Sequence, residues 1–140
     1  MRTFHRELGR VAMRAREYAV ATYSGFKVGA ALMTASGKVY TGCNVESSSY
    51  GLTLCAERVA LFKAISDGER KFKAIAIATD ATVPTPPCGA CRQVLSDLAG
   101  NIEVITMNTE NTLAVHRLNK LLPHAFTARH LGLRRTKKSR

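Results

Sequence analysis

Residues 55 to 91 read CAERVALFKAISDGERKFKAIAIATDATVPTPPCGAC, and their pattern predicts the central unit of the fold. The residues from Thr53 to Ser66 favour a helix, with Thr53 as its N-cap. The apolar residues 72 to 79 are typical of a buried strand. A proline-rich loop then leads to a second helix over about residues 88 to 98. The stretch therefore predicts a helix, a strand and a helix, with a thiol near the start of each helix.

The remaining elements extend this unit into a mixed sheet. They are a helix over residues 3 to 22, strands over 26 to 32, 39 to 45, 102 to 107 and 113 to 116, and a short helix over 120 to 122 that Asn119 caps. Only residues 108 to 112 join the last two strands, whereas a parallel crossover needs about a dozen residues or more. These strands should therefore run antiparallel. The sequence predicts a three-layer α/β/α domain with a mixed five-stranded sheet.

Length and composition favour one globular domain. The chain has 140 residues, of which 46% are hydrophobic and 22% charged. A chain of this length buries about two-thirds of its unfolded surface, so it does not need a metal merely to fold. Its longest apolar run, about five residues, argues against a membrane partner. The polar N-terminal segment is unlike a signal peptide, and four cysteines without one indicate a reducing cytoplasm.

The charge of the chain is strongly positive but unevenly distributed. The formal net charge of +11 is compatible with nucleic-acid binding. However, 6 of the 21 lysines and arginines lie in residues 129 to 140. Such an end is typical of a solvated, disordered tail. We therefore expect a domain over residues 1 to 132, a basic disordered tail over 133 to 140, and no nucleic-acid partner.

Three thiols are suited to one zinc ion. Cys88 and Cys91 have a spacing that can present two thiolates to a metal, or form a redox pair. Cys55 and Cys88 both lie near predicted helix N-termini, where the helix dipole favours thiolates. Three protein ligands leave the fourth position of tetrahedral zinc free for water. The sequence thus predicts one open zinc site and hydrolytic chemistry.

Charged residues beside the thiols complete this hypothesis. Glu57 would more often be an exposed helix residue if it stood alone, but beside three thiols it is a candidate for general acid–base catalysis. Three thiolates and one zinc ion sum to a charge of −1, which weakens the metal as a Lewis acid. Arg58 and Arg92 are candidates for the compensating positive charge, although each could also be a surface residue.

Several motifs along the chain point to one enzyme family. They are Cys55-Ala56-Glu57, Pro87-Cys88-Gly89-Ala90-Cys91-Arg92-Gln93, Tyr23 to Ala31, Gly42 to Glu46, Ser49 to Gly51 and Leu121 to Phe126. Together they resemble the small homotetrameric nucleoside cytidine deaminases, and the resemblance covers about residues 5 to 131. The zinc-deaminase motif alone fits any deaminase of this kind, whereas Asn44-Val45-Glu46 with Tyr50 is more specific for free cytidine.

The resemblance implies a cytidine-deaminase-like fold and a reaction. Free cytidine and 2′-deoxycytidine would be hydrolysed to uridine and 2′-deoxyuridine with release of ammonia, as in pyrimidine salvage. One Zn²⁺ per chain would be held by Cys55, Cys88 and Cys91. Glu57 would move protons while zinc-activated water attacks C4 of the cytosine ring.

The resemblance also implies binding roles. Asn44 and Glu46 would hydrogen-bond the ribose 3′-hydroxyl, which suits an amide and a carboxylate. Without the resemblance, Asn44 and Glu46 would be interpreted as ordinary loop residues, and the single aromatic residues as part of the core. The other implied roles are base contacts by Phe26 and the Ala56 backbone, hydrogen bonds near the thiolates by Arg58 and Gln93, and contacts in a neighbouring subunit's site by Tyr50 and Phe126.

Three alternatives differ from this interpretation in class or substrate. A closed four-cysteine module that binds nucleic acid would need Cys43 as a ligand, but its spacing to Cys55 is unsuitable and Glu57 would have no role. A polynucleotide deaminase would resemble relatives that place a helix between the last two strands and run them parallel. The short connection over residues 108 to 112 argues against that arrangement. A blasticidin-type deaminase shares the zinc motif, but Glu46 and Tyr50 favour a nucleoside. Departures from the family pattern are Pro86, His124 and the basic tail.

Overall fold

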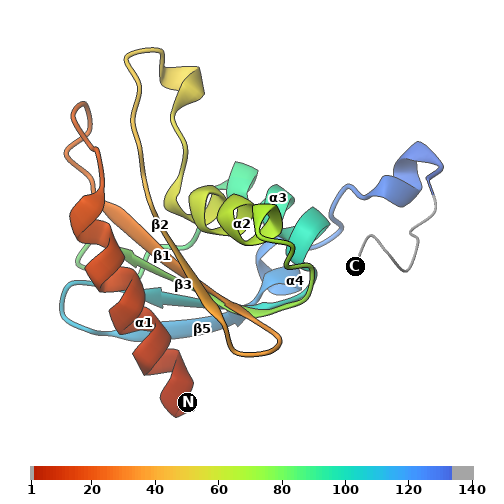
Figure 1. Cartoon of the computed structure of the whole chain (residues 1–140), viewed down its shortest axis with the longest axis horizontal. Helices are drawn as coiled ribbons and strands as arrows, with labels where there is room; N and C mark the ends of the chain where they lie inside the picture. Colours follow the sequence, from red (N-terminus) through yellow and green to blue (C-terminus); the bar gives the residue numbers. More distant parts are fainter. Residues whose placement is uncertain (1, 134–140) are drawn as a thin grey trace.

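The computed structural model describes residues 2–133, so the predicted basic tail lies almost wholly outside the described residues. A five-stranded mixed sheet in the order β2-β1-β3-β4-β5 forms the middle layer (Figure 1). Helix α1 packs on one face of the sheet, while α2, α3 and α4 pack on the other. The predicted three-layer α/β/α architecture is confirmed.

The elements occupy the following residues. The strands are β1 (Val28–Thr34), β2 (Val39–Cys43), β3 (Phe72–Thr79), β4 (Glu103–Met107) and β5 (Leu113–Arg117). The helices are α1 (Thr3–Ala15), α2 (Ala56–Ser66), α3 (Gly89–Ala99) and α4 (Leu118–Leu121). Short 3₁₀ turns are η1 (Arg16–Tyr18), η2 (Tyr50–Leu52) and η3 (Ala128–Leu131).

The last two strands are antiparallel, as the short connection between them predicts. The turn is organised by Asn108, whose side-chain oxygen accepts hydrogen bonds from the backbone N–H groups of Glu110 and Thr112. Asn111 in the same turn has a φ of 62°, a left-handed conformation that asparagine tolerates well. Strand β3 pairs in parallel with β4 and antiparallel with β1, which makes the sheet mixed.

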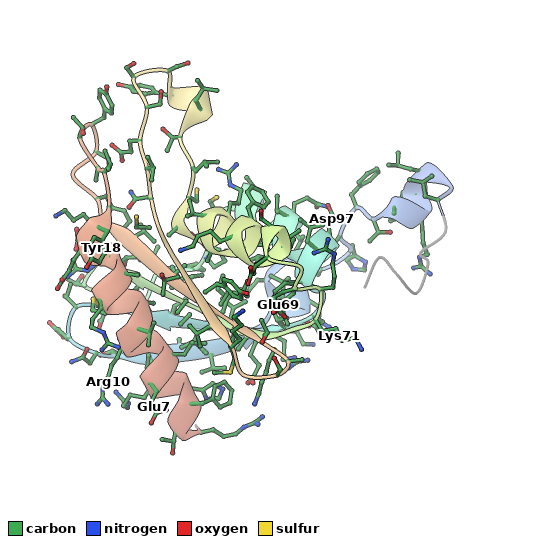
Figure 2. The ribbon with its side chains drawn as sticks, viewed as in Figure 1. Glu7, Arg10, Tyr18, Glu69, Lys71 and Asp97 are labelled. Atoms are coloured by element: carbon green, nitrogen blue, oxygen red, sulfur yellow. The ribbon has the colours of Figure 1, made fainter. Side chains whose placement is uncertain are left out.

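The central strand β3 presents different side chains to the two helical layers. Its isoleucines pack toward α2 and α3, whereas its buried alanines pack toward α1. Small residues on the α1 side let this helix approach closely. A Cβ at Gly29 would lie 2.0 Å from the carbonyl oxygen of Ala12, so only glycine fits there. The arginine-rich side of α1 is solvent-exposed, and Figure 2 shows Arg10 beside Glu7 on the outer side of this helix.

The N-terminal helix is shorter than its periodicity predicts. The predicted helix over residues 3 to 22 is wrong beyond Tyr18, because the following chain is extended. Val20 forms a β-bridge with Val45. The backbone N–H of Val20 donates to the carbonyl oxygen of Asn44, and the Val20 carbonyl oxygen accepts from the backbone N–H of Glu46. Pairing with a distant segment therefore overrides the local helical pattern. None of the helices within residues 2–133 has the length and apolarity needed to cross a membrane.

Two helix caps and two strand ends in the structure also differ from those that the sequence predicts. Cys55, not Thr53, is the N-cap residue of α2, and the Thr53 hydroxyl instead accepts a hydrogen bond from Ser47 N. Arg117 rather than Asn119 precedes α4. Strand β1 begins two residues after Phe26, and β2 ends at Cys43. These shifts arise because loop hydrogen bonds compete with regular pairing.

Candidate active site

The three predicted thiol ligands meet where α2 and α3 begin. Cys55 precedes the first residue of α2, Cys88 precedes the first residue of α3, and Cys91 lies in the first turn of α3. Their sulfur atoms all lie within 4.8 Å of one another, and Cys55 Sγ is 3.9 Å from Cys88 Sγ. Cys91 is buried while Cys88 is exposed. The cluster therefore has one side open to solvent.

The donor set fits a zinc ion, because soft thiolates are preferred zinc ligands. Without metal, the pKa of Cys55 is lowered to about 5, chiefly because Cys91 donates a hydrogen bond to its thiolate. The guanidinium of Arg58, 3.6 Å from Cys55 Sγ, adds to this effect. The pKa of Cys91 is raised, first because it is the donor in that bond and then by burial. Within residues 2–133, Cys43 does not join the metal-binding group, which argues against a closed four-cysteine site.

Glu57 lies in the first turn of α2, immediately beyond the thiol cluster. Its side chain is buried, and the residue is only 4% exposed. Burial raises the pKa of Glu57 to about 7, and the negative charge of Cys55 acts in the same direction. A carboxyl group with this pKa can both accept and release a proton near neutral pH, which is what general acid–base catalysis requires.

Comparison with known proteins agrees with this geometry. Residues 2–108 match the family described as "Cytidine and deoxycytidylate deaminase zinc-binding region". The chain belongs to the cytidine deaminases. It is therefore an enzyme of the hydrolase class with cytidine deaminase activity, and Zn²⁺ is the cofactor that its three-cysteine cluster fits.

The similarity extends over most of the domain. A cytidine deaminase from Sporosarcina psychrophila is 48% identical over 120 residues, which cover 85% of this chain and 88% of the relative. The crystal structure of cytidine deaminase from Burkholderia pseudomallei is 49% identical, with a TM-score of 0.84, and the match covers 90% of this chain and all of that chain. The structure of the Mycobacterium tuberculosis enzyme is 40% identical, with a TM-score of 0.74, over 86% and 94% of the two chains.

In this cytidine deaminase, the two residues predicted to bind the ribose, Asn44 and Glu46, both hydrogen-bond to the segment that leads into β1. Asn44 is 8% exposed; its side-chain oxygen accepts from Val28 N at 2.9 Å, and its amide donates to Phe26 O at 2.8 Å. Glu46 accepts from the backbone N–H groups of Tyr23 and Ser24 and from the Ser24 hydroxyl. These bonds lower the pKa of Glu46, with the Ser24 hydroxyl contributing most. The carboxylate therefore stays ionised at neutral pH.

The aromatic residues of the predicted site are partly or largely exposed. Phe26 is 38% exposed, Tyr50 is 74% exposed, and Phe126 is 56% exposed. Tyr50 contacts Tyr23 edge to face, with ring centroids 5.8 Å apart. A pocket of about 330 Å³ lies beside the rings of Tyr23 and Tyr50. Its lining residues are Tyr23, Ser24, Glu46, Tyr50 and Thr53. Tyr23 and Ser24 belong to a matching motif, but the sequence offered no role for them.

The other predicted site residues are dispersed. Ala56 is fully buried at the start of α2. Gln93 donates to the Phe126 carbonyl oxygen at 2.8 Å and approaches Asp97, while none of its hydrogen bonds within residues 2–133 reaches a thiolate. Its role near zinc stays a prediction. Arg92 instead joins two segments, donating to Pro87 O at 2.8 Å and to a carbonyl of α4.

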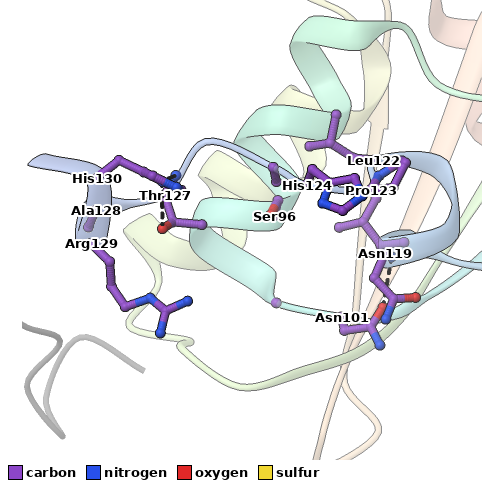
Figure 3. Close-up of a pocket in the computed structure, with 13 residues that line it drawn as sticks. Ser96, Asn101, Asn119, Leu122, Pro123, His124, Thr127, Ala128, Arg129 and His130 are labelled. Atoms are coloured by element: carbon purple, nitrogen blue, oxygen red, sulfur yellow. Dashed lines mark hydrogen bonds between the residues drawn. The ribbon is translucent and has the colours of Figure 1, made fainter.

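A larger hollow of about 950 Å³ lies beside the end of α3 (Figure 3). It is lined by the end of α3, by α4 and by residues 123 to 130, and it contains no cysteine. His124, one of the departures from the family pattern, lines it with a left-handed φ of 55°. That conformation favours glycine, but histidine adopts it more often than most other residues do.

Proposed function

We propose that this chain catalyses zinc-dependent deamination of free cytidine and 2′-deoxycytidine, giving uridine, 2′-deoxyuridine and ammonia, and that it serves pyrimidine salvage in the cytoplasm. The single observation that carries the proposal is the buried Glu57 beside three converging thiols. Bound zinc would supply a Lewis acid that makes water nucleophilic at neutral pH. Cys55, Cys88 and Cys91 would hold the metal.

Two neighbours of the thiols have separate tasks in this proposal. Glu57 takes the protons of the attacking water in turn and delivers one to ring N3 and the other to the leaving amino group, a cycle that suits its pKa of about 7. Arg58 offsets the excess negative charge of three thiolates, and its short distance to Cys55 Sγ supports this role. Gln93 is proposed to act near the thiolates as well, after a change in its hydrogen bonds.

The nucleoside is recognised by residues on the loops next to α2. Glu46 and Asn44 bind the ribose 3′-hydroxyl, while Phe26 packs on the base and the Ala56 backbone contacts the pyrimidine. Asn44 uses both ends of its amide on the backbone, which leaves one N–H for the ribose. Nothing in this set contacts a 2′-hydroxyl, so cytidine and 2′-deoxycytidine should react similarly.

An absorbance assay with five substrates tests this function. The purified zinc-loaded protein should deaminate cytidine and 2′-deoxycytidine with similar kcat/KM and should scarcely act on cytosine, because cytosine lacks the ribose that Glu46 binds. Equal turnover of cytosine would remove the ribose contacts from the proposal. Preferential turnover of blasticidin S, or of single-stranded DNA, would replace the substrate class.

The active enzyme is proposed to be a homotetramer in which Tyr50 and Phe126 complete a neighbour's site. Support comes from their exposure, since large aromatic side chains at the surface are typical of interfaces. Sedimentation should show an active tetramer. Mixing the inactive variants Glu57→Ala and Phe126→Ala and allowing subunits to exchange should restore activity, because some sites regain both intact residues. Tyr18→Ala, at another exposed aromatic residue, is the control and should stay active on its own; an active monomer would contradict shared sites.

A further inference from the structure

We propose that Ser24 is a positioning residue that holds Glu46 and Phe26 in one fixed arrangement for nucleoside binding. The inference rests on the proposed function, because that function assigns the ribose to Glu46 and the base to Phe26. It adds a residue that itself contacts neither metal nor base. Its evidence is the hydrogen-bond network of the loop before β1.

The Ser24 side chain links the two binding residues directly. Its hydroxyl donates a short hydrogen bond to Glu46 Oε2 and accepts one from Phe26 N at 3.0 Å. A hydroxyl has one hydrogen and two lone pairs, so both contacts can form at once. Through a single oxygen atom, the carboxylate and the backbone of the base-contacting residue are held together.

The backbone of the same turn strengthens this link. Ser24 N and Tyr23 N both donate to Glu46 Oε1, at 3.0 and 2.8 Å. Gly25 allows the turn with a φ of 69°, and its N–H donates to Ala21 O at 2.9 Å. Oε1 is thereby occupied by two donors, whereas the Ser24 hydroxyl is the only donor to Oε2 among residues 2–133. Oε2 therefore keeps room for one more donor, such as a ribose hydroxyl.

Without the hydroxyl, Glu46 should lose its fixed position. A partly exposed glutamate has several rotamers of similar energy, and ordering it costs side-chain entropy. The backbone donors would still hold Oε1, but Oε2 would be free to rotate and Phe26 N would lose its acceptor. Ser24 also lines the pocket beside Tyr50, so these changes would occur at the proposed binding surface. The thiol cluster should remain intact, because the hydrogen bonds of Ser24 within residues 2–133 go to Glu46 and Phe26 and not to a cysteine.

The test compares cytidine with 3′-deoxycytidine, which lacks the hydroxyl assigned to Glu46. Ser24→Ala should raise KM for cytidine about tenfold, the amount that loss of a hydrogen bond to a charged group costs. It should leave kcat and zinc content close to the starting protein. The preference for cytidine over 3′-deoxycytidine should shrink toward one. Ser24→Thr keeps the hydroxyl and should restore most of that preference.

Control variants distinguish the proposed role of Ser24 from the ribose-binding role of Glu46 on which it rests. Ser36→Ala removes another turn serine that makes a side-chain hydrogen bond, to Thr34, and should leave all four quantities unchanged. If Glu46→Gln keeps the full 3′-hydroxyl preference, the ribose role of Glu46 is wrong and the Ser24 inference is withdrawn with it. If Glu46→Gln loses the preference but Ser24→Ala retains it, only the Ser24 inference is overturned. Equal loss of kcat/KM for both substrates in Ser24→Ala would likewise assign Ser24 a purely structural role.

Discussion

Replacing Glu57 by alanine should lower kcat for cytidine by a factor of about 10²–10⁴, while zinc stays at one ion per chain. The carboxyl is buried next to the thiol cluster, and burial raises its pKa to about 7. Alanine removes the group that can take up and release a proton but leaves the three sulfur ligands in place. Steady-state kinetics with metal analysis of the same sample measures both effects.

The matched control for this variant is Glu7→Ala, on the outer side of α1 (Figure 2). It removes a carboxylate of the same size from the exposed surface and should leave kcat unchanged. Near-normal turnover by Glu57→Ala would contradict the proton-transfer role. Loss of zinc together with activity would instead show that Glu57 supports the metal site.

Replacing Cys91 by serine should remove both zinc and activity. Cys91 is fully buried, and it hydrogen-bonds the Cys55 thiolate in the metal-free site. A serine hydroxyl stays protonated and is a poor zinc ligand, so the ion would be left with two thiolates. Loss of a residue that only supports a zinc ligand weakens binding about 10–100-fold, and loss of the ligand itself should cost more. Competition with a chromophoric chelator measures this affinity.

Cys43→Ser is the matched control for the metal site. Cys43 is a partly buried cysteine at the end of β2, outside the group formed by the other three. This variant should bind zinc with unchanged affinity. The opposite pattern, with zinc lost in Cys43→Ser and kept in Cys91→Ser, would require a different ligand set. The two serine variants therefore distinguish an open three-thiol site from a closed four-thiol site.

Much of the architecture could be predicted because it depends on local patterns and short connections. The apolar run of β3 indicated a buried central strand, and the five residues between β4 and β5 allowed only antiparallel pairing. The thiol ligands were also predictable, since Cys88 and Cys91 are one helical turn apart. Cys55 joined them because residues before two helices can converge at one edge of the sheet.

Other features depended on hydrogen bonds and pairings that the local pattern of residues does not reveal. The helical periodicity of residues 3 to 22 continued past Tyr18, but pairing of Val20 with Val45 made that segment extended. Thr53 had the chemistry of an N-cap, but Cys55 took that position and Thr53 bonded to Ser47. A contact between distant segments in the first case, and a hydrogen bond within the loop before α2 in the second, outweighed a local preference of about 1 kcal/mol.

The amino-acid sequence was enough to predict the three-layer fold, the three thiols and the carboxyl beside them. These follow from residue type, periodicity and spacing, which act locally and need no knowledge of distant contacts. The burial of Glu57 and the hydrogen bonds by which the Ser24 hydroxyl joins Glu46 to Phe26 became visible only in the folded structure. Burial and hydrogen-bond partners depend on which segments pack together, and that packing sets the pKa of Glu57 and the geometry of the binding loop.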